Sequence, residues 1–235
     1  MTDDKLPSGS PALPKAGALS STLTIALHSH HAIRLWTGRQ KQTGAEGGAG
    51  RAPILSMPMA IHRTGKIQDD AALDNPYADA CLIRLEDRLN QARQRIEGGV
   101  ADLQAVMSAL PKQVSLTEVA CVSPLNIGIY SRTPAGYRCV WLLVGFDELA
   151  RLAFQAHHYG LISRTERDKR LSQGAHAVRQ VYGVIQSYRP FSVTRADIEA
   201  RNEAGLAAIE KGGELDSEIL LRKRRSVFSP DIRRG

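Results

Sequence analysis

The chain has 235 residues, of which 43% are hydrophobic and 23% are charged, a length that allows one domain of ordinary size or two small ones. Its 31 lysines and arginines outnumber 24 aspartates and glutamates, which gives a formal net charge of +7. The hydrophobic share excludes a wholly disordered chain, and the charge favours a polyanionic partner such as DNA, RNA or an acidic membrane surface. The apolar runs fall short of the roughly 20 residues that a bilayer span needs, so we expect a cytoplasmic protein without membrane segments.

The N-terminal part is expected to hold one strand between two irregular segments. Residues 1–20 are rich in proline, glycine and serine and predict a disordered leader. From Thr22 to Leu27, threonine and alanine alternate with leucine and isoleucine, which predicts a half-buried strand. Residues 37–52 contain five glycines and predict a mobile loop.

The strongest helical pattern runs from Tyr77 to Leu110. Asn75 can cap the free amides of a helix and Pro76 fits its first turn, so the helix is expected to begin there and to end before Pro111. Its apolar residues follow the a and d positions of a heptad over about four repeats, with Gly99 in the one missing place. They are Leu82, Leu85, Leu89, Ala92, Ile96, Leu103, Val106 and Leu110. The pattern fits either the seam of a coiled-coil dimer or a helix packed on its own domain.

The second half of the chain reads as a strand followed by helices. Tyr137 to Val144 is a strand-like apolar run, and a helix is expected to begin at Asp147, which can cap it, and to end at Gly160. Ser163 has the spacing of a capping box with Glu166 and predicts a second helix that ends near residue 188. A further helix is expected from about 194 to 211, where Gly212-Gly213 stops it. We expect residues 21–212 to form a single elaborated domain and residues 213–235 to form a frayed, basic C-terminal tail.

Strand, helix, turn and helix over residues 137–188 follow the plan of a ribbon-helix-helix DNA-binding module. The fold class expected is therefore α-rich α+β, with a ribbon-helix-helix-like core, an added long helix and an N-terminal strand. In such a module the strands of two protomers pair and enter the major groove, and the start of the second helix points at a phosphate. Thr22-x-Thr24 is a second candidate for the ribbon, and a strand simply packed under two helices is the alternative without DNA contact.

These assignments predict the DNA-contacting residues. Arg138 is predicted to contact the groove, and the rest of the run from Tyr137 to Val144 is apolar on both faces. Phosphate contacts are predicted for the Ser163 amide and for the side chains of Arg164, Arg167, Lys169 and Arg170. If five of the basic side chains of residues 137–190 contacted phosphate in each protomer of a dimer, the salt slope of log K would be about −9.

Catalytic and metal-binding patterns are not found in the sequence. It has no phosphate-binding glycine loop between a strand and a helix, and no Gly-x-Ser-x-Gly elbow. His28, His30 and His31 form the one tight histidine cluster, but no acid or cysteine lies close enough in sequence to complete a metal site. The three cysteines are far apart and odd in number, which excludes a disulfide framework. We therefore expect no enzyme, no metal and no other cofactor.

One resemblance extends over most of the chain, from about residue 20 to about residue 230. It rests on the segment from Thr22 to Arg39 (TLTIALHSHHAIRLWTGR), on 72–79 (ALDNPYAD) with Leu85-Glu86, and on 146–149 (FDEL) with Ala156-His157 and 160–162 (GLI). These segments resemble a proteobacterial family of integrating conjugative element proteins, a domain of unknown function. More distantly, the chain is similar to a ribbon-helix-helix transcriptional activator of plasmid conjugation. The resemblance implies residence on a mobile element and binding to DNA, and it implies no catalytic residue and no cofactor.

Together the residues and the resemblance lead to one expected function and one alternative. We expect a cytoplasmic homodimer that binds double-stranded DNA and regulates transfer genes of an integrative conjugative element. The alternative is a non-enzymatic structural or adaptor protein of the conjugation machinery, in which the 77–110 helix recruits other transfer proteins. A nuclease is disfavoured because the sequence has no acid cluster suited to two metal ions.

Overall fold

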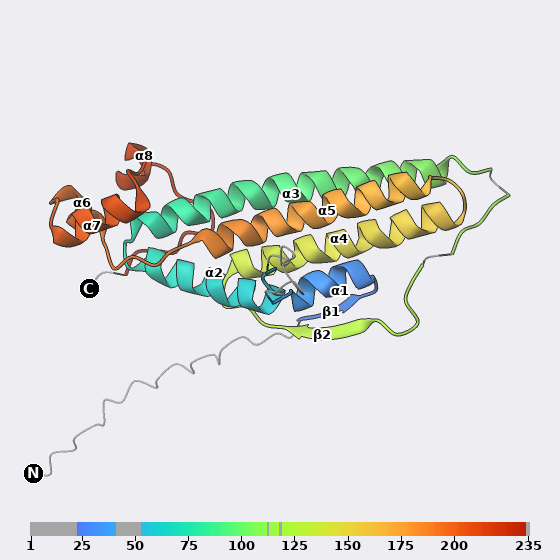
Figure 1. The fold of residues 1–235 in the computed structure, drawn as a ribbon, viewed down its shortest axis with the longest axis horizontal. Coiled ribbons are helices and arrows are strands. Elements are labelled where there is room, and N and C mark those ends of the chain that lie inside the picture. The colour runs from blue at the N-terminus through green and yellow to red at the C-terminus, as the bar shows by residue number, and fades with distance from the viewer. Residues whose placement is uncertain (1–22, 41–52, 112, 118, 234–235) are drawn as a thin grey trace, which may run out of the picture.

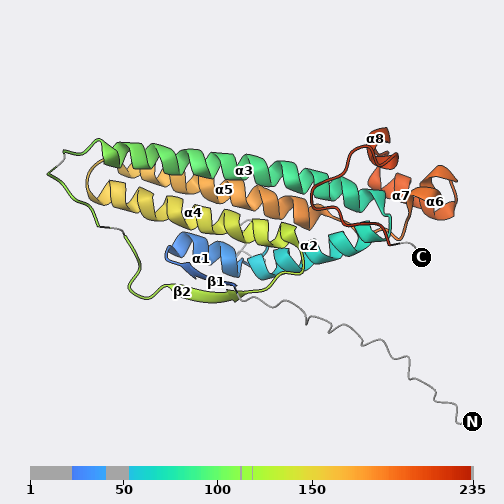
Figure 2. The same cartoon turned by 180° about the vertical axis from the view of Figure 1, so that it is seen from behind.

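The structure is a computed structural model of the chain, shown from two sides in Figures 1 and 2. It describes residues 23–40, 53–111, 113–117 and 119–233. The leader and most of the glycine-rich loop that the sequence predicted lie outside these residues. The elements, in chain order, are β1 (Leu23–Leu27), α1 (His30–Thr37), α2 (Met57–Ala72), α3 (Pro76–Ser108), β2 (Leu125–Ile129), α4 (Pro134–His158), α5 (Arg164–Ser187), α6 (Arg195–Glu199), α7 (Glu203–Gly212) and α8 (Ser217–Leu220).

Three long helices form an elongated bundle. Helices α3, α4 and α5 lie side by side, with α3 and α4 running in one direction and α5 running back (Figures 1 and 2). Helices α1 and α2 cover one side of this bundle, and the strands β1 and β2 lie outside α1. Helices α6, α7 and α8 gather at the end of the bundle where α3 begins.

The long helix α3 forms as the sequence predicts. Asn75 is its N-cap and accepts hydrogen bonds from the N–H groups of Tyr77 and Ala78, at 2.9 and 3.2 Å. The helix continues through Gly98 and Gly99. A Cβ at Gly99 would lie 3.0 Å from a methyl group of Leu149 on α4, so the missing place of the heptad is filled by α4.

The heptad of α3 is satisfied within the chain. Its buried positions belong to the main hydrophobic core, into which α4 and α5 pack. They are Leu82, Leu85, Leu89, Ala92, Ile96 and Leu103. Packing on its own domain is therefore confirmed for this stripe, and the heptad no longer argues for a coiled-coil dimer.

The strand predicted from Tyr137 to Val144 is wrong, because these residues form the first turns of α4. Thr133 is the N-cap and accepts a hydrogen bond from the N–H of Gly136 at 3.2 Å, and Pro134 occupies the first turn. The run is apolar on nearly all sides because α4 lies between α3, α5 and α2. A short apolar run of this kind does not distinguish a strand from a buried helix. Asp147, expected to cap a helix, lies in the middle of α4.

The ribbon-helix-helix unit expected at 137–188 is consequently wrong, whereas the α-rich α+β class is confirmed. The predicted N-terminal strand is present as β1, and it pairs antiparallel with β2 of the same chain, with Leu23 opposite Ile129 and Leu27 opposite Leu125. The order strand, helix, helix does occur in the chain, at β1, α1 and α2.

The C-terminal region is more ordered than the sequence suggested. Thr194 and Asp197 form a capping box, but the single helix expected from 194 to 211 is divided into α6 and α7, with Arg201 between them at φ 48°. Gly213, at φ 81°, ends α7 as predicted. The segment expected to be frayed forms α8 and then runs along α3, with Ile219 and Phe228 buried.

Candidate nucleic-acid interface

Arg138 lies apart from the other predicted DNA-contacting residues. It belongs to the first turns of α4, where its guanidinium donates a long hydrogen bond of 3.5 Å to the Asn90 side chain. Its role as a groove-contacting residue of a strand is wrong, because its segment is helical. The helix from Arg138 to His158 spans about 30 Å at 1.5 Å per residue. The structure therefore does not bring Arg138 together with residues 163–170.

Ser163 occupies the position that the sequence assigned to it. Gly160 takes a positive φ of 72° after α4, and the chain turns back into α5. The Ser163 hydroxyl accepts a hydrogen bond from the N–H of Glu166 at 3.1 Å, so it is the N-cap of α5. The Glu166 carboxylate pairs with Arg170 at 2.8 Å. The start of α5 is thus exposed to solvent, and the side chain of Ser163 caps it.

The four predicted basic side chains of α5 differ in how freely they reach solvent. Arg164 is 81% exposed, at 3.8 Å from Asp168, and Lys169 is exposed. Arg167 is 17% exposed and is held by Asp168 at 2.7 Å, with its guanidinium over the Phe154 ring. The hydrogen bond from Arg167 and the nearby positive charges lower the pKa of Asp168, which therefore stays ionised.

Arg170 is also committed to partners within the chain. Its side chain is 18% exposed and lies 3.3 Å from Asp102 on α3, in addition to its pair with Glu166. Of the four basic side chains, only Arg164 and Lys169 are therefore well placed to meet a phosphate without first leaving a buried contact. The local positive field is weaker than the count of basic residues suggests.

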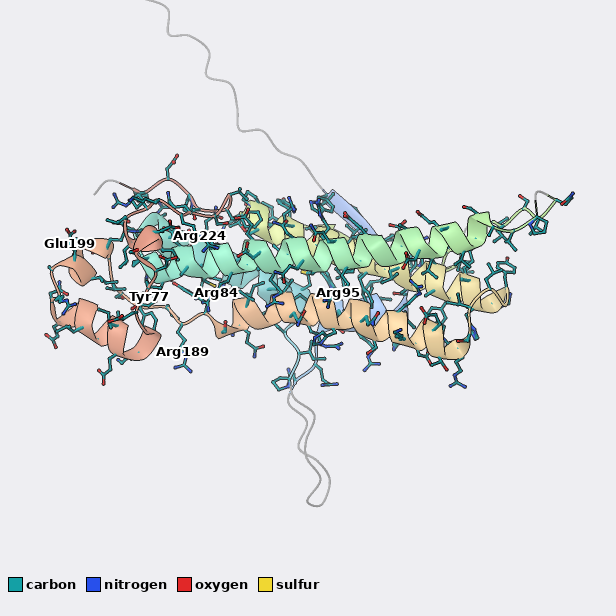
Figure 3. All side chains as sticks on the ribbon, turned by 90° about the horizontal axis from the view of Figure 1, so that it is seen from above. Tyr77, Arg84, Arg95, Arg189, Glu199 and Arg224 are labelled. Carbon is teal, nitrogen blue, oxygen red and sulfur yellow. The ribbon has the colours of Figure 1, made fainter. Side chains whose placement is uncertain are left out.

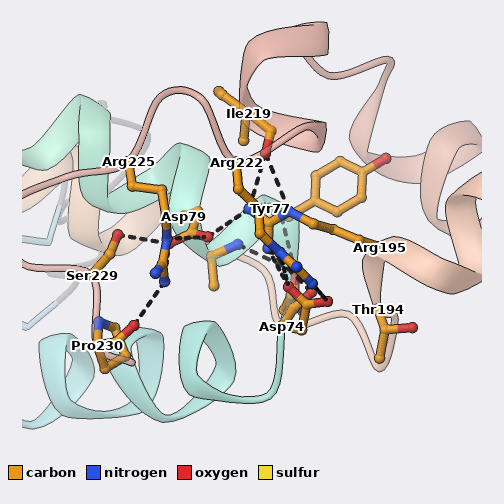
Figure 4. Close-up of polar contacts among 12 residues, drawn as sticks. Asp74, Tyr77, Asp79, Thr194, Arg195, Ile219, Arg222, Arg225, Ser229 and Pro230 are labelled. Carbon is orange, nitrogen blue, oxygen red and sulfur yellow. Dashed lines mark hydrogen bonds and ion pairs between the residues drawn. The ribbon is translucent and has the colours of Figure 1, made fainter. Parts of the chain in front are cut away.

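Three arginines of the basic C-terminal segment lie beside carboxylates of α3 and of the turn before it, and Figure 4 shows the pairs at Asp74 and Asp79. Arg222 pairs with Asp74 at 2.6 Å, and Arg225 lies 3.3 Å from Asp79. Arg224 is 3.6 Å from Asp87. These three arginines are each held beside an acid of the folded chain, so they do not form a free cationic tail.

One arginine links the C-terminal helices to the start of α3. Arg195 of α6 is buried and pairs with both Asp74 and Asp79, each at 2.6 Å, and it also donates to the carbonyl of Ile219 (Figure 4). The hydroxyl of Ser229 donates to Asp79 at 2.6 Å. Asp79 is fully buried, and its partners Arg195, Arg225 and Ser229 come from α6 and the C-terminal segment, so this cluster is a structural joint.

The two-stranded sheet presents a polar, small-residue face that the sequence revealed only in part. Ile25, Leu27 and Ile129 point into the core, whereas Thr24 and Asn126 are exposed on the other face. Asparagine and threonine side chains can hydrogen-bond to base edges in a major groove, which admits a two-stranded ribbon. Thr22, the other half of the second ribbon candidate, lies outside the described residues.

Strand β2, which carries Asn126, was missed in the sequence. The signal was the alternation of Leu125, Ile127 and Ile129, which lies beside Pro124 and a run of turn residues. A five-residue strand of this kind gains stability only when a partner strand is present, and its partner is about 100 residues away.

The histidine cluster is accounted for by hydrogen bonding and exposure. The ring of His28 accepts a hydrogen bond from the N–H of Cys121 at 3.1 Å, and His30 is exposed at the start of α1. Within the described ranges, no three His, Cys, Asp or Glu side chains come together as a metal site. None of the helices in this part of the chain has the length and apolar character to span a membrane.

A comparison with protein families decides the affiliation. The family described as "Transcriptional regulator AcaB" matches residues 15–233. The chain belongs to the AcaB family of transcriptional regulators. The regulatory role expected from the sequence is confirmed at this level.

A solved AcaB structure shares the fold. The crystal structure of selenomethionine-containing AcaB from uropathogenic E. coli superposes with a TM-score of 0.55 at 12% sequence identity, and the match covers 85% of this chain and 94% of that one. No curated protein matches the chain significantly. The helical bundle with its small sheet is thus an AcaB fold, although few individual residues are shared.

Proposed function

We propose that this AcaB-family protein is a cytoplasmic regulator that binds double-stranded DNA as a homodimer and controls transfer genes of an integrative conjugative element. Membership of a family of transcriptional regulators over residues 15–233 is the observation that carries the proposal. The net charge of +7 supports a polyanionic partner. The resemblance to integrating conjugative element proteins supports the class of target genes.

In this proposal, the start of α5 contacts phosphates and the two-stranded sheet contacts bases. Arg164 and Lys169, with the amide of Ser163 at the start of α5, contact phosphates, and Arg167 and Arg170 hold that tip on the bundle. Thr24 and Asn126, on the exposed face of the ribbon, read base edges in place of Arg138. Phosphate contacts position the protein, and base contacts give it sequence preference.

The proposed homodimer depends on a different feature from the heptad of α3 that suggested it in the sequence. The heptad of α3 is used inside the chain, but β1 and β2 form a two-stranded sheet, so each strand has one edge without a strand neighbour among the described residues. Edges of this kind can pair across a two-fold axis. Light scattering of the purified protein at several concentrations measures the oligomeric state, and a monomer throughout would remove this part of the proposal.

The experiment is an anisotropy titration of labelled promoter fragments from the element, repeated at several salt concentrations. Four phosphate contacts per dimer, from Arg164 and Lys169 of each protomer, predict a salt slope of log K of about −4. The variant R164E/K169E should weaken binding to every duplex and flatten the slope. The control K211E/K223E changes the net charge equally, at exposed residues of the opposite end, and should bind as the wild type does.

Sequence preference is tested with T24A and N126A on the same fragments. Each should cost about 1–3 kcal/mol on the preferred fragment, and it should have little effect on unrelated duplexes, because only the base contact is lost. Affinity that is absent, or equal for all sequences, would contradict a regulatory role. The adaptor alternative has lost its main support, since the apolar stripe of α3 that was to recruit a partner is buried.

A further inference from the structure

A hollow lies between α1 and α5, two helices that pack against each other. Its volume is about 260 Å³, and its floor is formed by apolar atoms, including those of Leu35 and Ala175. Four basic side chains line it: His31 and Arg34 of α1, Arg39 just after α1, and Arg179 of α5. His31, Arg34 and Arg39 are near one another in the sequence, whereas Arg179 is distant, and the packing of α1 on α5 brings it beside them.

The described lining of this hollow contains positive groups and no carboxylate. Burial and the nearby charge of Arg39 lower the pKa of Arg179. Burial, Arg34 and His30 lower the pKa of His31. Asp168, the acid that acts on His31, is engaged by Arg167 at 2.7 Å. No ion pair joins Arg34 or Arg179 to an acid in the described part of the chain.

The backbone that carries these residues is fixed by several contacts. The Tyr182 hydroxyl donates to the carbonyl of Leu35 at 3.2 Å and joins α5 to the last turn of α1. Gly38 ends α1 at φ 70°, and a Cβ there would lie 2.6 Å from the carbonyl oxygen of Ile54. Arg39 then exchanges two backbone hydrogen bonds with Ile54, at 2.9 and 2.8 Å. The cationic side chains therefore project from rigid positions.

We propose that this hollow binds a phosphate group. Guanidinium groups match the geometry of phosphate oxygens and remain charged when partly desolvated, and a bound anion would compensate the charges of Arg34 and Arg179. The volume is near the lower end for small-molecule sites, which suits inorganic phosphate or a small phosphomonoester. The group has two possible sources, a free small molecule or the backbone of DNA. Binding of free phosphate goes beyond the proposed function, because it does not require DNA.

The first arm of the test is calorimetric titration of the full chain with sodium phosphate at constant ionic strength. One phosphate per chain is expected. Both R34Q and R179Q should weaken phosphate binding by about tenfold to a hundredfold, because each removes a charge-assisted hydrogen bond. The control is R95Q, at an exposed arginine on α3 that is labelled in Figure 3, and it should leave phosphate binding unchanged. Thermal melts of all variants verify folding.

The second arm titrates the same variants with duplex DNA. Phosphate binding that is lost in R34Q and R179Q supports a free ligand. If free phosphate does not bind, but these two variants weaken DNA binding and flatten its salt slope where R95Q does not, the phosphate belongs to DNA. If the two variants change neither titration, or if phosphate binding persists in them, the proposal is overturned. DNA binding by the wild type is scored separately, so the proposed function can stand when this site fails.

Discussion

Asp147, in the middle of α4, accepts a 2.7 Å hydrogen bond from the backbone N–H of Ser29, the N-cap of α1. Its other carboxylate oxygen accepts the N–H of His28 at 2.9 Å, and the carboxylate is almost fully buried. The variant D147N presents an amide nitrogen to one of these N–H groups. We expect it to lower the free energy of unfolding by about 2–4 kcal/mol, measured by urea denaturation, because a buried donor loses a charged acceptor.

The neighbouring residue supplies the control for this prediction. Glu148 is only half-buried, so E148Q should change the free energy of unfolding by less than about 0.5 kcal/mol. Amide exchange at residues 28 and 29 should also become faster in D147N. Equal stability of D147N and E148Q would show that the β1–α1 junction is held by other contacts.

The role of Asp147 illustrates what the sequence conveys about this fold. Several start and stop signals with local chemistry were read correctly: Asn75 caps α3, Ser163 caps α5 and Gly213 ends α7, but the equally local cap of α4, Thr133, was missed. Asp147 looked like another cap because it is an acid before an apolar stripe. Its partners are N–H groups about 120 residues earlier, and no local pattern contains that information.

The joint between α6 and α3 depends on Asp79, which is fully buried and 2.6 Å from Arg195. Removal of one partner from a buried pair leaves an uncompensated charge, so D79N should cost about 3–5 kcal/mol of unfolding free energy. It should also release the segment after residue 213, which also loses its contacts from Arg225 and Ser229. Limited trypsin digestion should then cut at 222–225 faster than in the wild type.

A half-exposed pair in the same region tests whether burial is the cause. Asp87 lies 3.6 Å from Arg224, and both side chains are about half exposed. D87N should cost no more than about 1 kcal/mol and should leave the digestion pattern unchanged. If D87N lowered the free energy of unfolding as much as D79N does, the cause would be the change in net charge and not the loss of the buried ion pairs.

The candidate site shows the limit of counting charges along a sequence. The predicted residues 163–170 do lie together at the tip of α5, because they are neighbours on one helix. Arg167 and Arg170 are nevertheless drawn into pairs with Asp168 and Asp102, and the latter acid is on α3. Arg138 was assigned by a strand pattern that a fully buried helix also produces. The cationic hollow joins two helices more than 100 residues apart and has no sequence signature.

Close packing of α4 on α5 depends on Gly174. A Cβ at this position would lie 2.7 Å from the Phe146 ring and 2.9 Å from Leu149. G174A should therefore destabilise the protein by about 1–3 kcal/mol, although alanine favours helix more than glycine does. On the same helix, a Cβ at Gly183 meets nothing within 4 Å, so G183A should stabilise it by about 0.5–1 kcal/mol. Urea denaturation of both variants measures whether each one raises or lowers the free energy of unfolding. Stabilisation by G174A would contradict this packing.

Protonation of His31 should destabilise the folded protein. Burial, together with the charges of Arg34 and His30 on α1 and Arg167 on α5, lowers the pKa of its ring below 6.5, and only Asp168 acts in the opposite direction. The unfolded chain therefore takes up this proton at a higher pH than the folded one. Stability is complete above pH 6.5 and is lost as the pH falls through 6.5 towards the folded pKa.

The measurement is urea denaturation from pH 7.5 to pH 5.5 in a buffer without phosphate, with H31Q beside the wild type. H31Q should lose less stability over this range, because glutamine does not titrate. The exposed His158 provides the matched control, and H158Q should follow the wild type. NMR titration of the His31 ring should give a pKa below that of a free histidine, and added phosphate should raise it if the anion binds in the adjoining hollow. A ring that titrates at 6.5 or above in the free protein would contradict the cationic surroundings described for α1 and α5.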